Sequence, residues 1–122
     1  MRGYRDAADA NACARHQYEK ADVEMNRVYG QLMSELAGED DKNQRKLRQA
    51  QMLSLKYRDS NCESEASIYE GGSIRPAIYS HCLASITQER TRRLKASSLR
   101  PKCRPLCLVL CTLCSSLCFT KL

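Results

Sequence analysis

The chain has 122 residues, of which 43% are hydrophobic and 28% are charged. This is the size and composition of one soluble globular domain, and it excludes a disordered chain. Because the sequence contains no Trp and only one Phe, the core is expected to consist mainly of Leu, Ile, Ala, Met and Tyr. Leu, Ala and Met are strong helix formers, so this composition favours helices.

The net charge of +6 is unevenly distributed along the chain. Residues 1–89 contain 12 Lys and Arg against 14 Asp and Glu, whereas residues 90–122 contain 8 Lys and Arg and no acid. We therefore expect a mildly acidic helical part and a basic C-terminal segment. A basic segment is compatible with nucleic acid or anionic lipid. No nucleic-acid recognition motif accompanies it, so no nucleic-acid partner is expected.

The first predicted helix covers residues 8–37. Its apolar and small residues recur every three or four positions, which is typical of an amphipathic helix that packs along a partner. The stripe consists of Ala14, Tyr18, Ala21, Met25, Val28, Leu32 and Leu36.

Two further helices are predicted over residues 42–66 and 74–95. Gly71 and Gly72 separate them, and glycine permits the positive φ that a sharp reversal needs. No stretch alternates with period two, so no sheet is expected. The prediction is an all-α domain over residues 1–95, with a long antiparallel helical hairpin and a third helix.

Cys62 and Cys82 flank the Gly-Gly reversal, so the turn of the chain is expected to bring them together. A disulfide across this separation would stabilise the domain by roughly 3 kcal/mol and would indicate an oxidising compartment. The alternative is two buried free thiols, because free Cys is often buried. We favour the disulfide, which would link the third helix to the hairpin.

Residues 96–122 change character and form a basic linker followed by an apolar tail that contains five cysteines. The apolar part is too short for an ordinary transmembrane helix. Metal or iron–sulfur binding and palmitoylation are two interpretations of the cysteines. We prefer a third, in which the tail is an out-of-frame or read-through end and not part of the domain. Membrane contact is expected only through this tail.

Three stretches in order resemble one known family over residues 11–95. Residues 13–29 (CARHQYEKADVEMNRVY) are similar to its pattern C…Y..AD..LN..Y, and residues 47–62 (LRQAQMLSLKYRDSNC) are similar to L..AQ..W..YRD..C. The third stretch matches GGS..P…C….T..R…L. The family is the LprI-type lysozyme-inhibitor N-terminal domain. The matching residues expected to be structural are Asp22, Asn26, Tyr29, Gln51, Arg58, Asp59, Gly71, Gly72, Thr87 and Arg90.

The resemblance implies a periplasmic, secreted or lipid-anchored bacterial helical domain, some members of which inhibit lysozyme, with no cofactor and no reaction. The chain departs from the family at three places. Ser54 stands where the family usually has Trp. The upstream Cys that the family often has, and the signal peptide before it, are missing, and residues 1–20 contain no apolar core of a secretory signal. The tail after Lys95 has no counterpart in the family's pattern.

No catalytic constellation is present in the sequence. His16 and His81 are far apart, and there is no metalloprotease, phosphate-loop or nucleophile-elbow motif. We therefore expect a binding protein with no enzyme activity, no cofactor and no metal. The expected partner is a lysozyme or another basic secreted protein. The alternative is a structural, envelope-associated helical protein with no inhibitory activity.

The residues expected to contact a partner are Tyr57, Tyr69 and Glu70. Tyr is frequent at interface hot spots, and a loop held by a disulfide presents its side chains on a rigid scaffold. Arg58 is interpreted instead as structural, paired across the hairpin with a carboxylate such as Asp22 or Glu24.

Overall fold

The computed structural model describes residues 6–38 and 41–98 of the chain. These residues form three α-helices and no strand, namely α1 (Ala7–Leu36), α2 (Asp41–Ser67) and α3 (Arg75–Ser98). The all-α prediction is confirmed, and the predicted bounds are close to the observed ones. The predicted basic linker and Cys-rich tail lie almost entirely outside the described residues.

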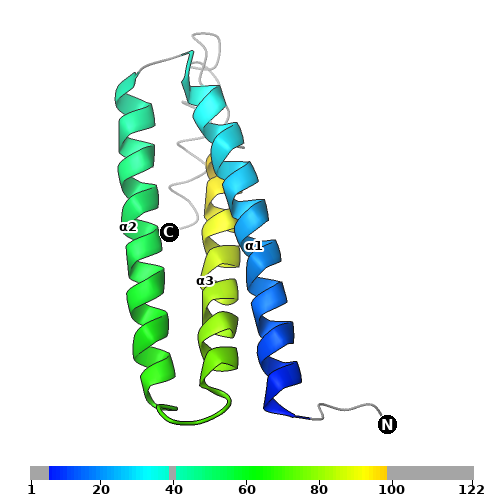
Figure 1. Cartoon of the computed structure of the whole chain (residues 1–122). Coiled ribbons are helices and arrows are strands. Elements are labelled where there is room, and N and C mark those ends of the chain that lie inside the picture. Colours follow the sequence, from blue (N-terminus) through cyan, green and yellow to red (C-terminus); the bar gives the residue numbers. More distant parts are fainter. Residues whose placement is uncertain (1–5, 39–40, 99–122) are drawn as a thin grey trace, which may run out of the picture.

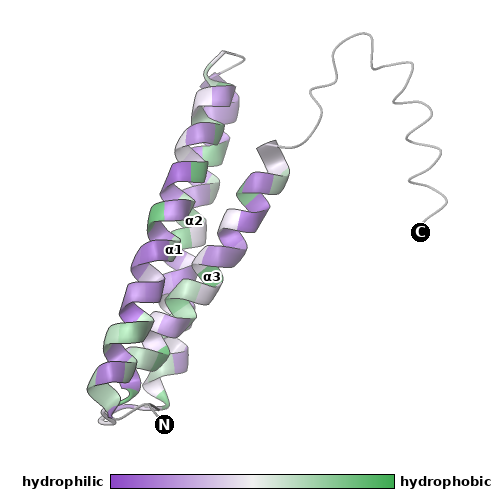
Figure 2. Ribbon diagram, turned by 90° about the vertical axis from the view of Figure 1, so that its right-hand side faces the viewer, coloured by the Kyte–Doolittle hydropathy of each residue, from purple (hydrophilic) through white to green (hydrophobic). Residues whose placement is uncertain are grey.

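The three helices run up, down and up along the bundle (Figure 1). The antiparallel hairpin of α1 and α2 is confirmed, but the most extensive packing in the bundle lies between α1 and α3. Helix α3 lies between the other two helices in Figure 1 and is inclined to them in Figure 2. Helix α3, rather than α2, therefore covers most of the apolar stripe of α1.

Helix α1 begins with a side-chain cap that the sequence analysis did not identify. The Asp9 amide donates to Oδ1 of Asp6 over 2.9 Å, which satisfies one of the free N–H groups of the first turn. The carboxylates of Asp6 and Asp9 also lie at the positive end of the helix dipole.

The largest part of the core joins α1 to the C-terminal half of α3. Met25 and Leu94 are 1% and 2% exposed, and they cluster with Val28 and Leu32. At the other end, Ala10, Ala14 and Ala77 form a second cluster. This cluster consists of small side chains from α1 and α3 only.

A disulfide between Cys62 and Cys82 joins α2 to α3, as predicted. Their Cα atoms lie 5.5 Å apart, and 20 positions separate them in the sequence. Both residues are buried and pack with Leu83. The bridge lies close to the turn between the two helices, so it holds that end of the bundle together.

The charge of the bundle differs from the expectation. Residues 90–95 belong to α3, and Leu94 lies in the core. The boundary at residue 89 that was used to count charges therefore lies inside a packed helix. Residues 1–95 contain 16 Lys and Arg against 14 Asp and Glu, so the helical domain as a whole is not acidic. What matters for binding is the local distribution of charge.

Candidate functional site at the turn between α2 and α3

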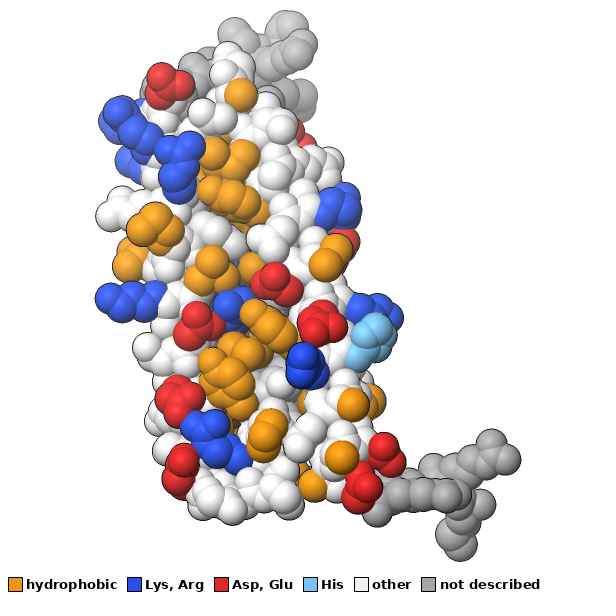
Figure 3. Space-filling model, viewed as in Figure 1, with side chains coloured by type: hydrophobic (Ala, Val, Ile, Leu, Met, Phe, Trp, Pro, Cys, Tyr) orange, Lys and Arg blue, Asp and Glu red, His pale blue; other side chains and the backbone are white. Residues whose placement is uncertain are grey.

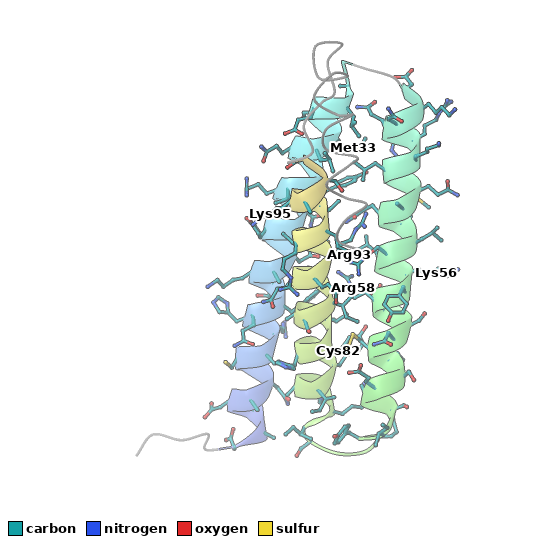
Figure 4. All side chains as sticks on the ribbon, turned by 180° about the vertical axis from the view of Figure 1, so that it is seen from behind. Met33, Lys56, Arg58, Cys82, Arg93 and Lys95 are labelled. Atoms are coloured by element: carbon teal, nitrogen blue, oxygen red, sulfur yellow. A yellow bond between two sulfur atoms is a disulfide. The ribbon has the colours of Figure 1, made fainter. Side chains whose placement is uncertain are left out.

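Arg58 is the centre of a polar network inside the bundle. Its Nη1 lies 3.4 Å from Oδ1 of Asp22 and donates to Oγ1 of Thr87 over 3.2 Å, while its Nε donates to Asp59 over 2.8 Å. Figure 4 shows Arg58 on the side of α2 that faces α3. The guanidinium also lies 5.4 Å from the centroid of the Tyr18 ring. One side chain thus connects all three helices.

The surroundings keep Arg58 charged. Burial opposes the charged form, but the hydrogen bond to Asp59 and the fields of Tyr18, Asp59 and Asp22 leave its pKa raised. Burial in turn raises the pKa of the Tyr18 hydroxyl, which remains neutral at physiological pH. Neither group is prepared for proton transfer, so the network has a structural character.

Gln51 and Arg90 extend the polar interior toward the core. Arg90 Nε donates to Oε1 of Gln51 over 2.9 Å, and the Gln51 amide lies 3.5 Å from the sulfur of Met25. Asn26 donates to Asp22 at the edge of the network over 3.2 Å, and Tyr29 packs against the largest core cluster. The family-motif residues therefore lie within the bundle or support it.

The turn between α2 and α3 has a defined backbone. Gly71 has φ of +79°, which non-glycine residues rarely adopt. The Gly72 amide donates to the Tyr69 carbonyl over 2.9 Å, and a Cβ added at Gly72 would lie 3.1 Å from that oxygen. The backbone of the turn therefore favours glycine at Gly71, and a side chain at Gly72 would crowd the Tyr69 carbonyl.

Side chains from both neighbouring helices hold this turn in place. Arg75 Nε donates to Oε2 of Glu70 over 3.0 Å, and the same guanidinium pairs with Glu63. The hydrogen bond to Glu70 raises the pKa of Arg75, so the Arg75 side chain stays positively charged. From α1, Nδ2 of the Asn11 side chain donates to the backbone carbonyl of Ser73 over 3.1 Å. With the nearby disulfide, these contacts present the turn as an ordered surface.

We define the turn surface as Ile68, Tyr69, Glu70 and Ile74. Ile68 is 81% exposed, and Tyr69 and Ile74 are 43% and 44% exposed. They lie at the end of the bundle where the chain reverses, at the bottom of Figure 1. Three exposed apolar side chains on one short segment give it the composition of the centre of a protein interface.

Acidic side chains surround the turn surface. Glu63 and Glu65 come from the end of α2, and Asp9 comes from the start of α1. One basic side chain, Arg75, lies among them and pairs with Glu63 and Glu70. Figure 3 shows red acidic side chains at this end of the molecule, whereas blue basic ones gather on the upper part of α2. The turn surface is thus apolar at its centre and mainly acidic around it.

The structure separates the three residues expected to contact a partner. Tyr69 and Glu70 belong to the turn surface, but Tyr57 lies three helical turns before Tyr69 on the exposed side of α2, about 18 Å along the helix. Ile68 and Ile74 were not predicted, because the sequence shows that they lie beside the Gly-Gly turn but not that they point outward. Arg75, which holds the turn, was not predicted either.

Ser54 lines an open groove between α2 and α3. The groove has a volume of about 360 Å³ and is also lined by Tyr57, Ile86, Glu89, Arg90 and Arg93. Ser54 occupies the position where the family pattern has Trp. The position at which the resemblance leads us to expect Trp therefore lies in the wall of this groove.

Two kinds of feature were not found within residues 6–38 and 41–98. No group of three or more His, Cys, Asp or Glu side chains is arranged to hold a metal ion. None of the three described helices has an apolar stretch long enough to cross a membrane. Among the described residues, Cys13 is a free and exposed thiol.

Comparison with known proteins gives two matches. A family model described as lysozyme inhibitor LprI matches residues 2–94. An uncharacterized protein of Rhizobium meliloti (strain 1021) is 33% identical to the chain over 97 residues, which cover 71% of this chain and 70% of that protein. No solved structure matches the chain significantly.

Proposed function

We propose a function for this chain, which belongs to the lysozyme inhibitor LprI family. It is an exported bacterial protein that inhibits a lysozyme by stoichiometric binding. The inhibitor acts without chemistry of its own. Arg58 is paired with Asp22 and Asp59, and the pKa values of Arg58 and Tyr18 are both raised, so neither side chain changes its protonation state near neutral pH.

The turn surface is the part of the molecule that we assign to the lysozyme. The observation that carries this assignment is the exposure of Ile68, Tyr69 and Ile74 on an ordered turn. An ordered surface loses little conformational entropy on binding, which favours affinity. Tyr69 offers a large contact area with few rotatable bonds, and Tyr is enriched among residues that dominate binding energy.

Charge supports the same assignment. Lysozymes targeted by such a family are typically basic, and the acidic side chains around the turn surface would attract a basic partner to this end of the bundle. Such attraction raises mainly the association rate and is screened beyond about 8 Å at physiological ionic strength. The local acidic rim serves this purpose even though the whole domain is not acidic.

The assignment is tested by inhibition assays with the full chain and two tyrosine variants. In the assay, lysozyme lyses bacterial cell walls and the loss of turbidity is followed at increasing inhibitor concentration. Tyr69→Ala should raise the inhibition constant at least about tenfold, the effect of losing one hot-spot side chain. Tyr57→Ala is the matched control, because Tyr57 is 63% exposed but lies on another surface.

Each outcome of this comparison has a defined meaning. A large effect of Tyr69→Ala with an unchanged Tyr57→Ala variant supports the turn surface. The reverse pattern, or equal effects, places binding elsewhere on the molecule. If the unmodified chain inhibits no lysozyme at all, the alternative of a structural envelope-associated protein is favoured.

A further inference from the structure

The outer side of α2 combines basic and apolar side chains in an unusual way. Residues 42–58 contain six Lys and Arg and no Asp or Glu. Within this stretch, Met52 and Leu53 are 66% and 60% exposed. Exposed large apolar residues within such a basic stretch are not explained by the packing of the bundle or by the turn surface.

Helical spacing places these side chains together. Arg45 and Met52 are seven residues apart, as are Lys46 and Leu53, so each pair lies two turns apart on the same side of the helix. Lys56 follows Met52 by four residues and Leu53 by three, which places it one turn further along. We call these five residues the α2 face. Figure 4 shows Lys56 on the side of α2 away from the other helices.

The three basic side chains of the α2 face make no ion pair among the described residues, and the carboxylates one turn away on the same helix are Asp41 and Asp59. Among the ion pairs of the described residues, none involves Arg45, Lys46 or Lys56. By contrast, the exposed Val23 of α1 has Glu19 and Glu24 on its own side of the helix, and both carboxylates are paired. Val23 and the α2 face therefore differ in their electrostatic surroundings.

We propose that the α2 face binds the surface of an anionic lipid bilayer. A helix with Lys and Arg around exposed apolar side chains lies in the plane of the interface, with its apolar residues between the headgroups and the charges near anionic lipids. Each basic residue near such a surface strengthens binding about fivefold. This binding is independent of the proposed lysozyme inhibition, because the turn surface lies at the acidic end of the bundle.

Two further observations favour a lipid surface over an acidic protein. The bundle has five pockets whose described lining does not include Met52 or Leu53, and a bilayer needs no shape complementarity. Residues 99–122 add four Lys and Arg and no acid to the same chain. Stable membrane binding generally requires two weak signals, and the α2 face and this basic segment provide two.

Fluorescence offers a direct test because the chain contains no Trp. Leu53→Trp places a single reporter in the α2 face, and Val23→Trp is the matched control on α1, where the replaced side chain is 70% exposed. Both full-length variants are mixed with vesicles of phosphatidylcholine, with and without phosphatidylglycerol. We expect a blue shift only for the reporter at position 53 and only with phosphatidylglycerol. Equal shifts at the two positions, or no shift at position 53, would overturn the proposal.

Charge neutralisation separates the α2 face from the C-terminal segment. A variant with Arg45→Gln, Lys46→Gln and Lys56→Gln should bind phosphatidylglycerol vesicles at least tenfold more weakly in sedimentation. The control with Arg15→Gln, Lys20→Gln and Arg27→Gln removes the same charge from α1 and should change binding less than threefold. Circular dichroism establishes that both variants are folded.

A third variant carries Arg100→Gln, Lys102→Gln and Arg104→Gln in the C-terminal segment. The proposal predicts a blue shift at position 53 in this background as well, although overall binding is weaker. If vesicle binding depends wholly on these three residues, or if the α1 control weakens binding as much as the α2 variant, the α2 face is not a membrane site. If an acidic protein but not the vesicles shifts the emission at position 53, the partner is a protein and the proposal is wrong.

Discussion

Arg58 of α2 and Asp22 of α1 form an ion pair of 3.4 Å across the bundle. The Arg58 side chain is 10% exposed, and the Asp22 side chain is 36% exposed. The pair matters because α1 and α2 make few other contacts along their length. The same guanidinium reaches Thr87 of α3, so it fixes the positions of the three helices relative to one another.

Replacing Arg58 should therefore destabilise the bundle. Arg58→Ala removes the positive charge from the polar interior, and we expect the free energy of unfolding to fall by about 2 kcal/mol. This is less than the usual cost of breaking a fully buried ion pair, because Asp22 and Asp59 are partly exposed. For a domain of this size, this corresponds to a decrease in Tm of roughly 10 °C. Arg15→Ala is the control, since its side chain is 73% exposed and pairs only with Glu19. Similar Tm values for the two variants would contradict the structural role of Arg58.

The disulfide should contribute more to stability than any single ion pair. Replacing Cys62 and Cys82 together by Ser should lower the free energy of unfolding by about 3 kcal/mol, because the bridge closes a 20-residue separation. Thermal unfolding with and without a reductant provides the measurement. The reductant should lower the Tm of the unmodified chain but leave that of the double variant unchanged. A reductant effect of equal size on both would mean that another cysteine is responsible.

Filling the groove at Ser54 should stabilise the protein. Ser54→Trp places an indole ring against Ile86 and next to Arg90 in the groove of about 360 Å³. We expect the free energy of unfolding to rise by about 1 kcal/mol, because the indole ring is buried and contacts the guanidinium of Arg90. Ser60→Trp, on the exposed side of the same helix, should have little effect on Tm. A lower Tm for Ser54→Trp would show that the groove is too tight for the ring.

Acid should weaken one contact between α1 and α3. Hydrogen bonds from Arg27 and, to a smaller extent, from Lys95 lower the pKa of Glu24 from 4.5 to about 2. Lys95 belongs to α3, and its Nζ lies 3.2 Å from Oε1 of Glu24 on α1. Because the folded-state pKa is the lower one, the stabilisation is fully present above about pH 4.5 and is lost as the pH falls toward 2. The Tm difference between the unmodified chain and Glu24→Gln should be small, since the site is exposed, and should vanish over this range. A difference that persists at about pH 2 would exclude this origin.

Periodicity in the sequence was sufficient to predict the helices but not their partners. The stripe through Ala14, Met25 and Leu32 correctly predicted the buried side of α1. It did not indicate that α3 would cover that stripe, because a hydrophobic period reports which side of a helix is buried and not what buries it. The interior side of α2 is largely polar, with Gln51 and Arg58 among its buried residues, so α2 was a weaker partner for an apolar stripe.

The candidate site was predicted in part for a similar reason. Gly71 and Gly72 predicted the turn, and Tyr69 and Glu70 were expected to contact a partner because they lie next to it. Tyr57 was grouped with them on residue type alone, and its distance along α2 separates it from the turn. The exposure of Ile68 could not be read from the sequence, because an apolar residue near a helix end can point inward or outward.

The most direct test of the proposed function is a titration of lysozyme with the full chain. Residual lysis of bacterial cell walls is measured at a lysozyme concentration well above the dissociation constant of the complex. Stoichiometric inhibition predicts a linear decrease in activity that ends at one molecule of this chain per lysozyme, and a titration with Tyr69→Ala that no longer ends sharply. Full lysozyme activity at a large excess of the folded, disulfide-bonded chain would contradict the account.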